Sequence, residues 1–390
     1  MKKTLKENGG LPLSLLWTMA VVAGVTVANL YYNQPLLHMI SSDLGVTEFA
    51  TNQIAMTTQI GYALGLMFIV PLGDLLPRRL IVITNFTVLV ISLMVIANAR
   101  SIELILVASL LTGMCSIVPQ IFIPVAAQYS TPDKKGRNVG IVVSGLLSGI
   151  LISRVVSGVV GEFIGWRFMF MMAAALMVIC AVIMLRVLPD MKANYTGTYI
   201  GLMKSIISLV CRYPVLRVSA VRAGLGFGSI MAMWTSLAFH MEHAPFYAGS
   251  HVVGLLGLCG VAGVLSASFI GSYVGKIGLV RFNCIGAALM LIAWFCLSVL
   301  GDSYAGVIAG VVIIDVGLQC IQLSNQTSLF AIEPKASNRI NTVFMTTYFA
   351  GGSLGTLLAG VAWSLWGWNG VVCAGVMLTL LSLLVNMKKV

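Results

Sequence analysis

Residues 80–97 read LIVITNFTVLVISLMVIA, and this stretch decides the fold. It contains no charged side chain, and its apolar residues do not alternate with polar ones as they do in the strands of a membrane barrel. A helix that crosses the apolar core of a bilayer needs about 20 residues of this kind. The stretch therefore predicts a membrane-spanning helix, in which every backbone polar group is paired within the segment.

The composition extends this prediction to the whole chain. Of the 390 residues, 59% are hydrophobic and only 9% are charged, and the mean hydropathy is +0.99. Soluble domains contain about 25% charged residues, so this chain lacks the polar surface that water requires. Apolar stretches long enough to cross a bilayer recur twelve times, near residues 14–37, 52–72, 80–98, 103–127, 139–161, 168–188, 216–239, 252–274, 282–300, 304–330, 340–361 and 369–387. The sequence predicts an all-α membrane protein with twelve transmembrane helices.

The basic residues lie mostly in alternate connections between the expected helices. If the N-terminus is cytoplasmic, the inner connections and the two tails hold 19 Lys and Arg residues, whereas the outer connections hold only Arg100 and Arg167. This bias is the positive-inside pattern of membrane proteins. We therefore expect both termini in the cytoplasm. The net charge of +11 then reflects the orientation of the chain in a lipid bilayer, and we expect no nucleic-acid partner.

A polar, basic connection separates two halves of the chain. Within it, Tyr199–Val210 places Leu202, Ile206 and Leu209 on one side, which predicts a short helix in the membrane interface. We expect three units, which are an N-terminal six-helix bundle over residues 1–188, a cytoplasmic linker over 189–217 and a C-terminal six-helix bundle over 218–390.

The two halves also resemble each other. Residues 157–166, SGVVGEFIGW, align with residues 359–368, AGVAWSLWGW, at a constant offset of 202, and Arg137 matches Arg339 at the same offset. The aligned segments fall on the expected fifth and eleventh helices. Parallel repeats of six helices build the substrate path of some transporter folds, so the alignment predicts two pseudo-symmetric bundles.

The turn between the second and third expected helices carries a family resemblance. It reads Pro71-Leu72-Gly73-Asp74-Leu75-Leu76-Pro77-Arg78-Arg79. It resembles the inner-loop motif G-x-L-A-D-R-x-G-R-[KR] of the major facilitator superfamily, with Asp74, Arg78 and Arg79 at matching positions. Val70, Leu75 and Pro77 replace the first glycine, the inner arginine and the second glycine. The resemblance implies that the acid and the two arginines lock the inner gate through charge-assisted hydrogen bonds. The alternative is that they only anchor the helix ends at the membrane surface.

The whole chain resembles one branch of this superfamily, the bacterial sugar and drug efflux permeases. The resemblance is carried by residues 28–36, ANLYYNQPL, and by residues 341–345, NTVFM. It implies the major facilitator fold, a place in the bacterial inner membrane, and drug:proton antiport. Two positions differ from the antiporters of the family. Ser109 stands where many carry an arginine in helix 4, and Ser153-Arg154 stands where helix 5 carries a Gly-Pro pair.

Charged residues inside the expected helices are rare. Of the twelve acids, only Asp315 lies in the middle of a helix, and among the bases only Arg154 lies deep, with Arg222 a turn or more inside helix 7. An ionised group at the centre of a bilayer costs on the order of 3 kcal/mol, so such residues are expected to face a cavity or a partner. Asp315 can act as a proton carrier, because burial disfavours its charged form and a nearby arginine favours it.

Helix 10 carries a polar stripe. Asp315, Gln319, Gln322 and Gln326 are spaced at i, i+4, i+7 and i+11, which places them on one face. The resemblance implies that helices 1, 4, 7 and 10 line the central cavity. The remaining candidates for its lining are therefore Asn29, Tyr32, Asn33, Gln120, Arg222 and Trp234. The alternative is that the stripe joins helices through hydrogen bonds.

These residues suggest a mechanism. We expect an Arg154–Asp315 contact to form or break as the two bundles rock, with Arg154 bonding to backbone carbonyls or serines as the alternative. The leading function is proton-coupled export of a small organic compound (a drug, sugar or metabolite) by alternating access. The alternative within transport is an uptake symporter or facilitator for a sugar-like nutrient. A membrane ligand sensor and an intramembrane enzyme are the other classes, but no signalling domain and no paired catalytic groups are seen.

We expect no cofactor. The sequence has no Walker-type phosphate loop, which argues against a pump driven by ATP. The eight cysteines are scattered without the spacing of a zinc site or a disulfide framework. A metal site made by His240 and His243 is the alternative that remains open. The expected protein is a monomeric transporter that is not an enzyme and whose partners are protons and a small-molecule substrate.

Overall fold

The computed structural model describes residues 5, 7–189, 191, 197–266, 273, 278–333 and 336–387, and these residues form helices and no strand. The N-terminal half contains α1 (Leu13–Ala28), η1 (Gln34–Leu36), α2 (Leu37–Leu44), α3 (Glu48–Phe68), η2 (Val70–Asp74), α4 (Arg78–Asn98), α5 (Ile102–Cys115), α6 (Val118–Tyr129), α7 (Lys135–Phe163) and α8 (Trp166–Val187). The rest of the chain contains α9 (Tyr199–Arg212), α10 (Pro214–Glu242), α11 (Ser250–Leu256), η3 (Gly257–Gly260), α13 (Leu279–Val299), α14 (Tyr304–Ile332) and α15 (Ser337–Met387).

The helices account for the twelve expected crossings. Among the described residues, nine helical segments are long and apolar enough to cross a membrane. One of them, α15, is two helices, because Trp366 and Gly367 have non-helical backbone angles and Gly367 has a φ of 57°, which favours glycine. Leu13–Ala28 and Ser250–Ser266 are shorter apolar helices that supply the first and eighth crossings. The last part of the expected eighth helix, after Ser266, lies mostly outside the described residues.

Two of the expected helices are interrupted. The first was expected over residues 14–37, but α1 ends at Ala28 and the chain turns through Asn29–Asn33 before η1 begins. The fourth was expected over 103–127, but it is divided into α5 and α6 around Ser116 and Ile117. Each break comes just before a proline, Pro35 or Pro119, which lacks the N–H group that would continue the helical bonding.

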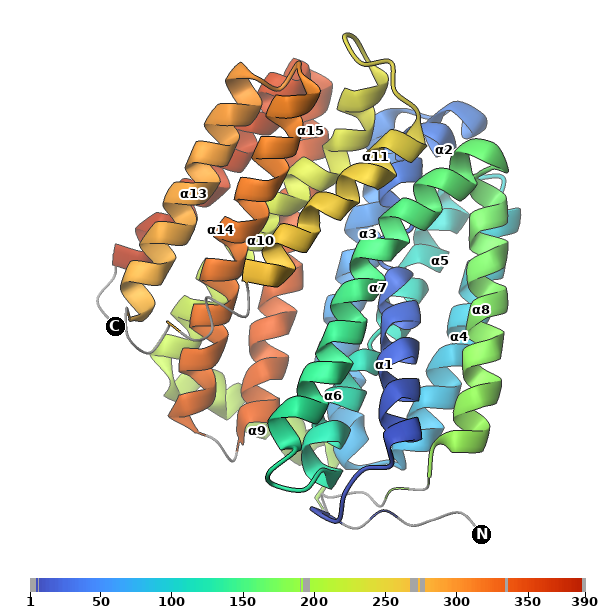
Figure 1. The fold of residues 1–390 in the computed structure, drawn as a ribbon, viewed down its shortest axis with the longest axis vertical. Coiled ribbons are helices and arrows are strands. Elements are labelled where there is room, and N and C mark those ends of the chain that lie inside the picture. Colours follow the sequence, from blue (N-terminus) through green and yellow to red (C-terminus); the bar gives the residue numbers. More distant parts are fainter. Residues whose placement is uncertain are drawn as a thin grey trace.

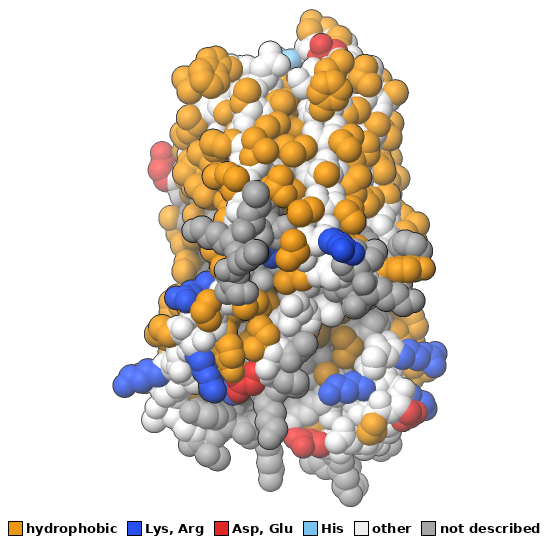
Figure 2. Space-filling model, turned by 90° about the vertical axis from the view of Figure 1, so that its left-hand side faces the viewer, with side chains coloured by type: hydrophobic (Ala, Val, Ile, Leu, Met, Phe, Trp, Pro, Cys, Tyr) orange, Lys and Arg blue, Asp and Glu red, His pale blue; other side chains and the backbone are white. Residues whose placement is uncertain are grey.

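The two bundles stand side by side, with the N-terminal helices on the right and the C-terminal helices on the left of Figure 1. The short helices α2 and α11 lie at one end of the molecule, which we call the α2 end. Helix α9 lies at the opposite end, which we call the α9 end. Figure 2 shows that apolar side chains cover the part of one face toward the α2 end, whereas Lys and Arg side chains gather toward the α9 end.

Helix α9 connects the bundles at this end. It buries Leu202, Ile206 and Leu209, the residues that the sequence pattern places on one side. The hydroxyl of Tyr199 donates to the carbonyl oxygen of Phe68 at 3.0 Å, which ties α9 to the N-terminal bundle. Helix α10 begins at Pro214, so the seventh crossing starts within the expected linker.

Glycines allow equivalent helix pairs to approach closely in each bundle. In the N-terminal bundle Gly149 of α7 faces Gly24 of α1, and in the C-terminal bundle Gly355 of α15 faces Gly228 of α10. A Cβ atom at any of these positions would overlap the facing backbone. Small residues permit this packing between membrane helices. The matching pairs agree with the pseudo-symmetry that the internal repeat predicts.

Candidate substrate cavity between the bundles

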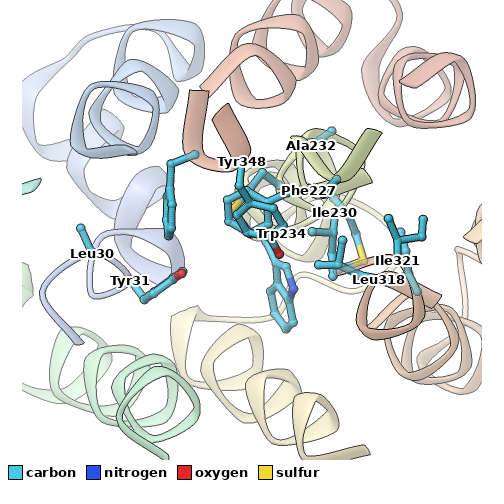
Figure 3. Close-up of a cluster of buried hydrophobic side chains, with 14 of the residues drawn as sticks. Leu30, Tyr31, Phe227, Ile230, Ala232, Trp234, Leu318, Ile321 and Tyr348 are labelled. Carbon is cyan, nitrogen blue, oxygen red and sulfur yellow. The ribbon is translucent and has the colours of Figure 1, made fainter. Parts of the chain in front are cut away.

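A cavity of about 150 Å³ lies between the two bundles. Its wall includes Tyr31, Gln120, Arg154, Trp234, Asp315 and Gln322. Figure 3 shows Tyr31 pointing from the N-terminal side toward Trp234 and Tyr348 of the C-terminal bundle. Aromatic rings therefore form much of the wall, and the charged groups reach it from opposite bundles.

Arg154 is held by neutral partners. Its Nε–H donates to Oε1 of Gln34 at 2.9 Å. The carbon atom of its guanidinium group lies 4.1 Å from the centroid of the Trp234 ring and 5.0 Å from that of Tyr31. Its exposed fraction is only 5%. Such cation–π contacts stabilise a buried arginine when no carboxylate is paired with it.

Asp315 reaches the same cavity from α14. Its Oδ2 atom is buried and has no hydrogen-bond partner among the described residues. Arg154 is close enough to interact with it electrostatically. However, in the part of the chain that the structure describes, no base lies within the 4.0 Å of an ion pair with Asp315. The two residues that the sequence pairs therefore face one cavity but do not form a salt bridge in this state.

Two glycines of the eighth crossing lie against the charged side chains, and one of them, Gly257, makes room for Arg154. A Cβ atom at Gly257 would lie 2.8 Å from Cβ of Arg154, and one at Gly260 would lie 3.5 Å from Oδ2 of Asp315. Both glycines belong to η3, a short 3₁₀ segment in the C-terminal half. This segment therefore contacts Arg154 of the opposite bundle and Asp315 of its own bundle.

The glutamine stripe on α14 is divided between two environments. Gln319 and Gln322 line the cavity, and Oε1 of Gln322 accepts a hydrogen bond from the hydroxyl of Tyr348 at 2.9 Å. Gln326 instead donates from Nε2 to Oδ1 of Asn341 at 2.9 Å, in a contact between α14 and α15. The stripe therefore lines the cavity at Gln319 and Gln322, and it joins α14 to α15 through hydrogen bonds of Gln322 and Gln326.

The three candidates after α1 do not gather at the cavity. Asn29 donates to the backbone oxygens of Val25 and Thr26, and Asn33 donates to Oγ1 of Thr58 at 3.2 Å. Tyr32 lines a separate groove between α1 and α7. The expected first helix over residues 14–37 would have carried all three, but the helix ends at Ala28.

The other candidates differ in their position. Trp234 and Gln120 line the cavity, and Nε2 of Gln120 donates to the hydroxyl of Tyr62 at 3.3 Å. Arg222 is buried outside its lining and donates to Oδ1 of Asn325 at 3.0 Å, between α10 and α14. The deep arginine of helix 7 is thus part of a helix–helix contact.

A second cavity, of about 320 Å³, lies between the bundles at the α9 end. Asp74 and Arg78 line it from the N-terminal bundle, and Arg339 lines it from the C-terminal bundle. Asp74 interacts electrostatically with both arginines. Gln120 lines this cavity as well as the central one, so the two cavities adjoin.

The arginines of the turn also bond within their own bundle. Nη1 of Arg78 donates to Oε1 of Gln128 at 2.9 Å, and Nη2 of Arg79 donates to the carbonyl oxygen of Leu185 at 2.5 Å. Arg78 and Arg79 therefore tie the start of α4 to α6 and α8. Asp74 is the member of the motif that interacts electrostatically with Arg339 of the opposite bundle.

The α2 end is closed by direct contacts between the bundles. Nδ2 of Asn52 donates to the carbonyl oxygen of Thr356 at 2.7 Å. The backbone N–H of Ser250, the first residue of α11, donates to Oε2 of Glu162 at 2.9 Å. The central cavity is thus covered at the α2 end and adjoins a larger cavity at the α9 end.

Comparison with known proteins now assigns the family. The family model described as Major Facilitator Superfamily matches residues 16–356. The chain belongs to the major facilitator superfamily.

The relatives of this chain are transporters by name. It is 36% identical over 380 residues to an uncharacterized transporter, YgaY, of Escherichia coli O157:H7, and the match covers 97% of this chain and 96% of the relative. It is 32% identical over 359 residues to a "probable transporter" of Streptomyces coelicolor, covering 91% and 83% of the two chains. A crystal structure of the nucleoside transporter NupG superposes with a TM-score of 0.77 at 11% identity, covering 96% of this chain and 99% of that chain. That likeness concerns the fold alone. The chain is a multi-pass membrane transporter.

Several residues that form or support the cavity wall are not among those that the sequence predicts. Tyr31, which lines the cavity, and Gln34, which bonds to Arg154 beside it, lie in the stretch that carries the family resemblance. Tyr62 and Tyr348 also line the cavity, although no pattern in the sequence singles them out. The available signal was an amide or a hydroxyl inside an apolar crossing, since each such group needs a partner there.

Proposed function

We propose that this transporter exports a small organic compound in exchange for protons, with Asp315 as the proton carrier. The observation that carries the proposal is the buried Oδ2 atom of Asp315, which has no hydrogen-bond partner among the described residues and belongs to a side chain that lines the cavity between the bundles. A carboxylate left charged and unpaired in such a place is costly, whereas the neutral acid is tolerated.

Arg154 supplies the second half of the proposed cycle. In this state it rests on Gln34 and Trp234, and its charge is not used to pair Asp315. If the bundles rock and bring Arg154 to Asp315, the ion pair replaces the proton, which leaves to water. The neutral partners of Arg154 then have to release it, so proton release and the change of access occur together.

The resemblance to efflux permeases supports export as the direction, and the charges give the orientation of the chain. Lys and Arg side chains gather toward the α9 end (Figure 2), which supports a cytoplasmic α9 end under the positive-inside rule. We therefore place both termini in the cytoplasm of a bacterial cell, with the protein a monomer in the inner membrane. Residues 1–188 and 218–390 are then the two moving bundles, and residues 189–217 are their cytoplasmic linker.

The cavity wall supports an uncharged or weakly charged substrate with an aromatic or apolar part. Tyr31, Trp234 and Tyr348 provide ring faces, and Gln319 provides an amide group. The central cavity is smaller than the usual range of ligand pockets, about 300–1,000 Å³. Together with the adjoining cavity at the α9 end, the space reaches that range.

The experiment is proton movement in everted inner-membrane vesicles that have been acidified inside. A transported compound from a chemically varied panel, added outside, should release lumenal protons if the protein is an antiporter. Asp315→Asn should lose at least about 90% of this release while still binding the compound. The matched control is Asp302→Asn, since Asp302 is an exposed acid just before α14. Unchanged proton release by Asp315→Asn would end the proposal.

Right-side-out vesicles distinguish the uptake alternative from export. In right-side-out vesicles a proton symporter would make the external medium more alkaline when its substrate is added outside. A facilitator would move the compound without any proton signal. If a compound gives either result and also fails to release protons from everted vesicles, the proposed function changes from export to uptake.

A further inference from the structure

A histidine at the α2 end bridges two carboxylates that belong to different bundles. Nδ1 of His38 lies 3.1 Å from Oε1 of Glu48, the first residue of α3. Nε2 of His38 lies 2.8 Å from Oε2 of Glu242, the last residue of α10. Helices α2 and α3 belong to the N-terminal bundle, and α10 belongs to the C-terminal bundle. The contact with Glu242 therefore joins the two bundles.

This geometry requires a proton on each ring nitrogen. A neutral imidazole has one N–H donor and one acceptor nitrogen, whereas an ionised carboxylate can only accept. His38 can donate to Glu48 and to Glu242 at the same time only as the imidazolium ion. In a neutral His38, the lone pair of the unprotonated ring nitrogen would face one of the two carboxylates, and the two groups would repel each other.

The groups around His38 belong to the same arrangement. Nε1–H of Trp363 donates to Oε2 of Glu48 at 2.6 Å, so α15 of the opposite bundle holds this carboxylate in place. The ring of His243, which follows α10, lies edge-on to His38 with centroids 6.1 Å apart. His240 of α10 turns elsewhere, because it stacks on Trp368.

Three charged or titratable groups of the described residues thus face His38. They are Glu48 at the start of α3, Glu242 at the end of α10, and His243, which follows α10. On α2 itself, Asp43 bonds to Arg167. The side chains of His38 and Glu242 are 31% and 14% exposed. Protons can therefore reach the cluster from the α2 end.

We propose that His38, Glu48 and Glu242 form a proton-binding site that holds the α2 end closed when the proton is bound. The inference goes beyond the proposed function, because it concerns closure of one end and applies to either direction of transport. It assigns a proton to a place on the surface of the bundles, well separated along the chain from Asp315.

The electrostatics agree with the geometry. Hydrogen bonds to Glu242 first, and then to Glu48, raise the pKa of His38 from 6.5 to about 10. When the bundles separate at this end, Glu242 leaves with α10 and its contribution is lost. Closure is therefore most strongly favoured at low pH, below the pKa that His38 keeps with Glu48 alone, and the benefit disappears as the pH rises toward 10.

The experiment measures the distance across the α2 end in the full-length protein in detergent. Spin labels are placed at Ser42→Cys and Tyr247→Cys, two exposed positions on opposite bundles, with the exposed cysteines Cys211, Cys284 and Cys373 replaced by serine. Electron–electron double resonance then gives the populations of the closed and open ends between pH 6 and pH 9.5. The closed-to-open ratio of the otherwise unchanged protein should fall at least about tenfold over this range.

Three variants separate the proposal from a general effect of pH. His38→Gln, which cannot titrate, should show a ratio that does not change with pH. Glu242→Gln leaves the Glu48 contact intact and should shift the opening to lower pH, which keeps the test valid if His38→Gln folds poorly. His251→Gln alters another histidine at this end, which lies 3.7 Å from Glu162, and should keep the full response. A response that persists in His38→Gln, or a pH-independent ratio in the unchanged protein, would overturn the proposal.

Discussion

Arg154 and Asp315 face one cavity from opposite bundles, yet no ion pair within 4.0 Å joins these two described residues. Gln34 and the rings of Trp234 and Tyr31 hold the arginine instead. The arrangement explains how a buried base and a buried acid can coexist without neutralising each other. It also identifies the neutral partners as the part of the site that sets when the two charges meet.

Replacing Arg154 by lysine tests these neutral partners. Lysine keeps the charge but has neither the Nε–H that bonds to Gln34 nor the flat face that lies over Trp234. Losing one hydrogen bond and one cation–π contact is worth about 1–3 kcal/mol, so we expect transport to fall about 5- to 100-fold.

The control for Arg154→Lys is Arg222→Lys, because Arg222 is equally buried but bonds to Asn325 outside the cavity. The control should lower thermal stability and leave the transport rate per folded molecule unchanged. Initial rates of uptake into everted vesicles, divided by the amount of folded protein, give the comparison. Equal losses in both variants would mean that Arg154 has only a structural role.

Tyr348→Phe tests the wall of the cavity without removing a ring. The ring of Tyr348 stacks on Phe227 at 4.0 Å, and its hydroxyl donates to Gln322. Phenylalanine keeps the stacking, and frees the amide of Gln322 from this bond, at a cost of about 1 kcal/mol. We expect the apparent KM for the substrate to change about fivefold with a smaller effect on the maximal rate. A variant with unchanged KM would place the substrate away from Tyr348.

Gly149→Val should destabilise the N-terminal bundle. The added side chain would meet the backbone of Gly24 on α1, where the two helices cross. Overpacking of this kind costs about 1–3 kcal/mol, so the melting temperature of the purified protein should fall by several degrees. Gly140→Val is the matched control on the same helix, because a Cβ atom there would contact nothing within 4 Å. The melting temperature of the control should stay within error of the unchanged protein.

The stability of the protein should depend on pH through His38. Because the pKa of His38 is raised to about 10 in the closed state, its contribution is complete below pH 6.5 and is lost as the pH rises toward 10. The melting temperature of His38→Gln should therefore lie furthest below that of the unchanged protein near pH 6. The two melting curves should converge near pH 10. A difference that grows with pH would contradict the sign of this prediction.

The crossings were predictable because their signal is simple. A span of about 20 apolar residues can do little other than cross a bilayer, and that property does not depend on tertiary contacts. The apolar side of α9 was likewise visible in the spacing of Leu202, Ile206 and Leu209. Asp315 could be selected because an acid in mid-helix needs a cavity or a partner.

The rest of the site depends on contacts between distant segments. Gln34 meets Arg154 only because the turn after α1 is brought against α7, and no local pattern encodes that meeting. The helical spacing that places Gln326 on the face of Asp315 is correct, but the face extends past the cavity to Asn341 of α15. Periodicity assigns a side of a helix and cannot say what lies opposite each turn of it.

The Trp234 ring next to Arg154 has a further consequence, because one face of an indole holds one partner at a time. A substrate that stacks on this face would displace Arg154 from the ring. The displaced guanidinium group would then be able to form an ion pair with Asp315. The substrate and Arg154 would then compete for the same face of the Trp234 ring, so the arginine would be held there only when no substrate is bound. In Trp234→Leu that competition would be gone, and compounds that still bind would be carried without moving protons.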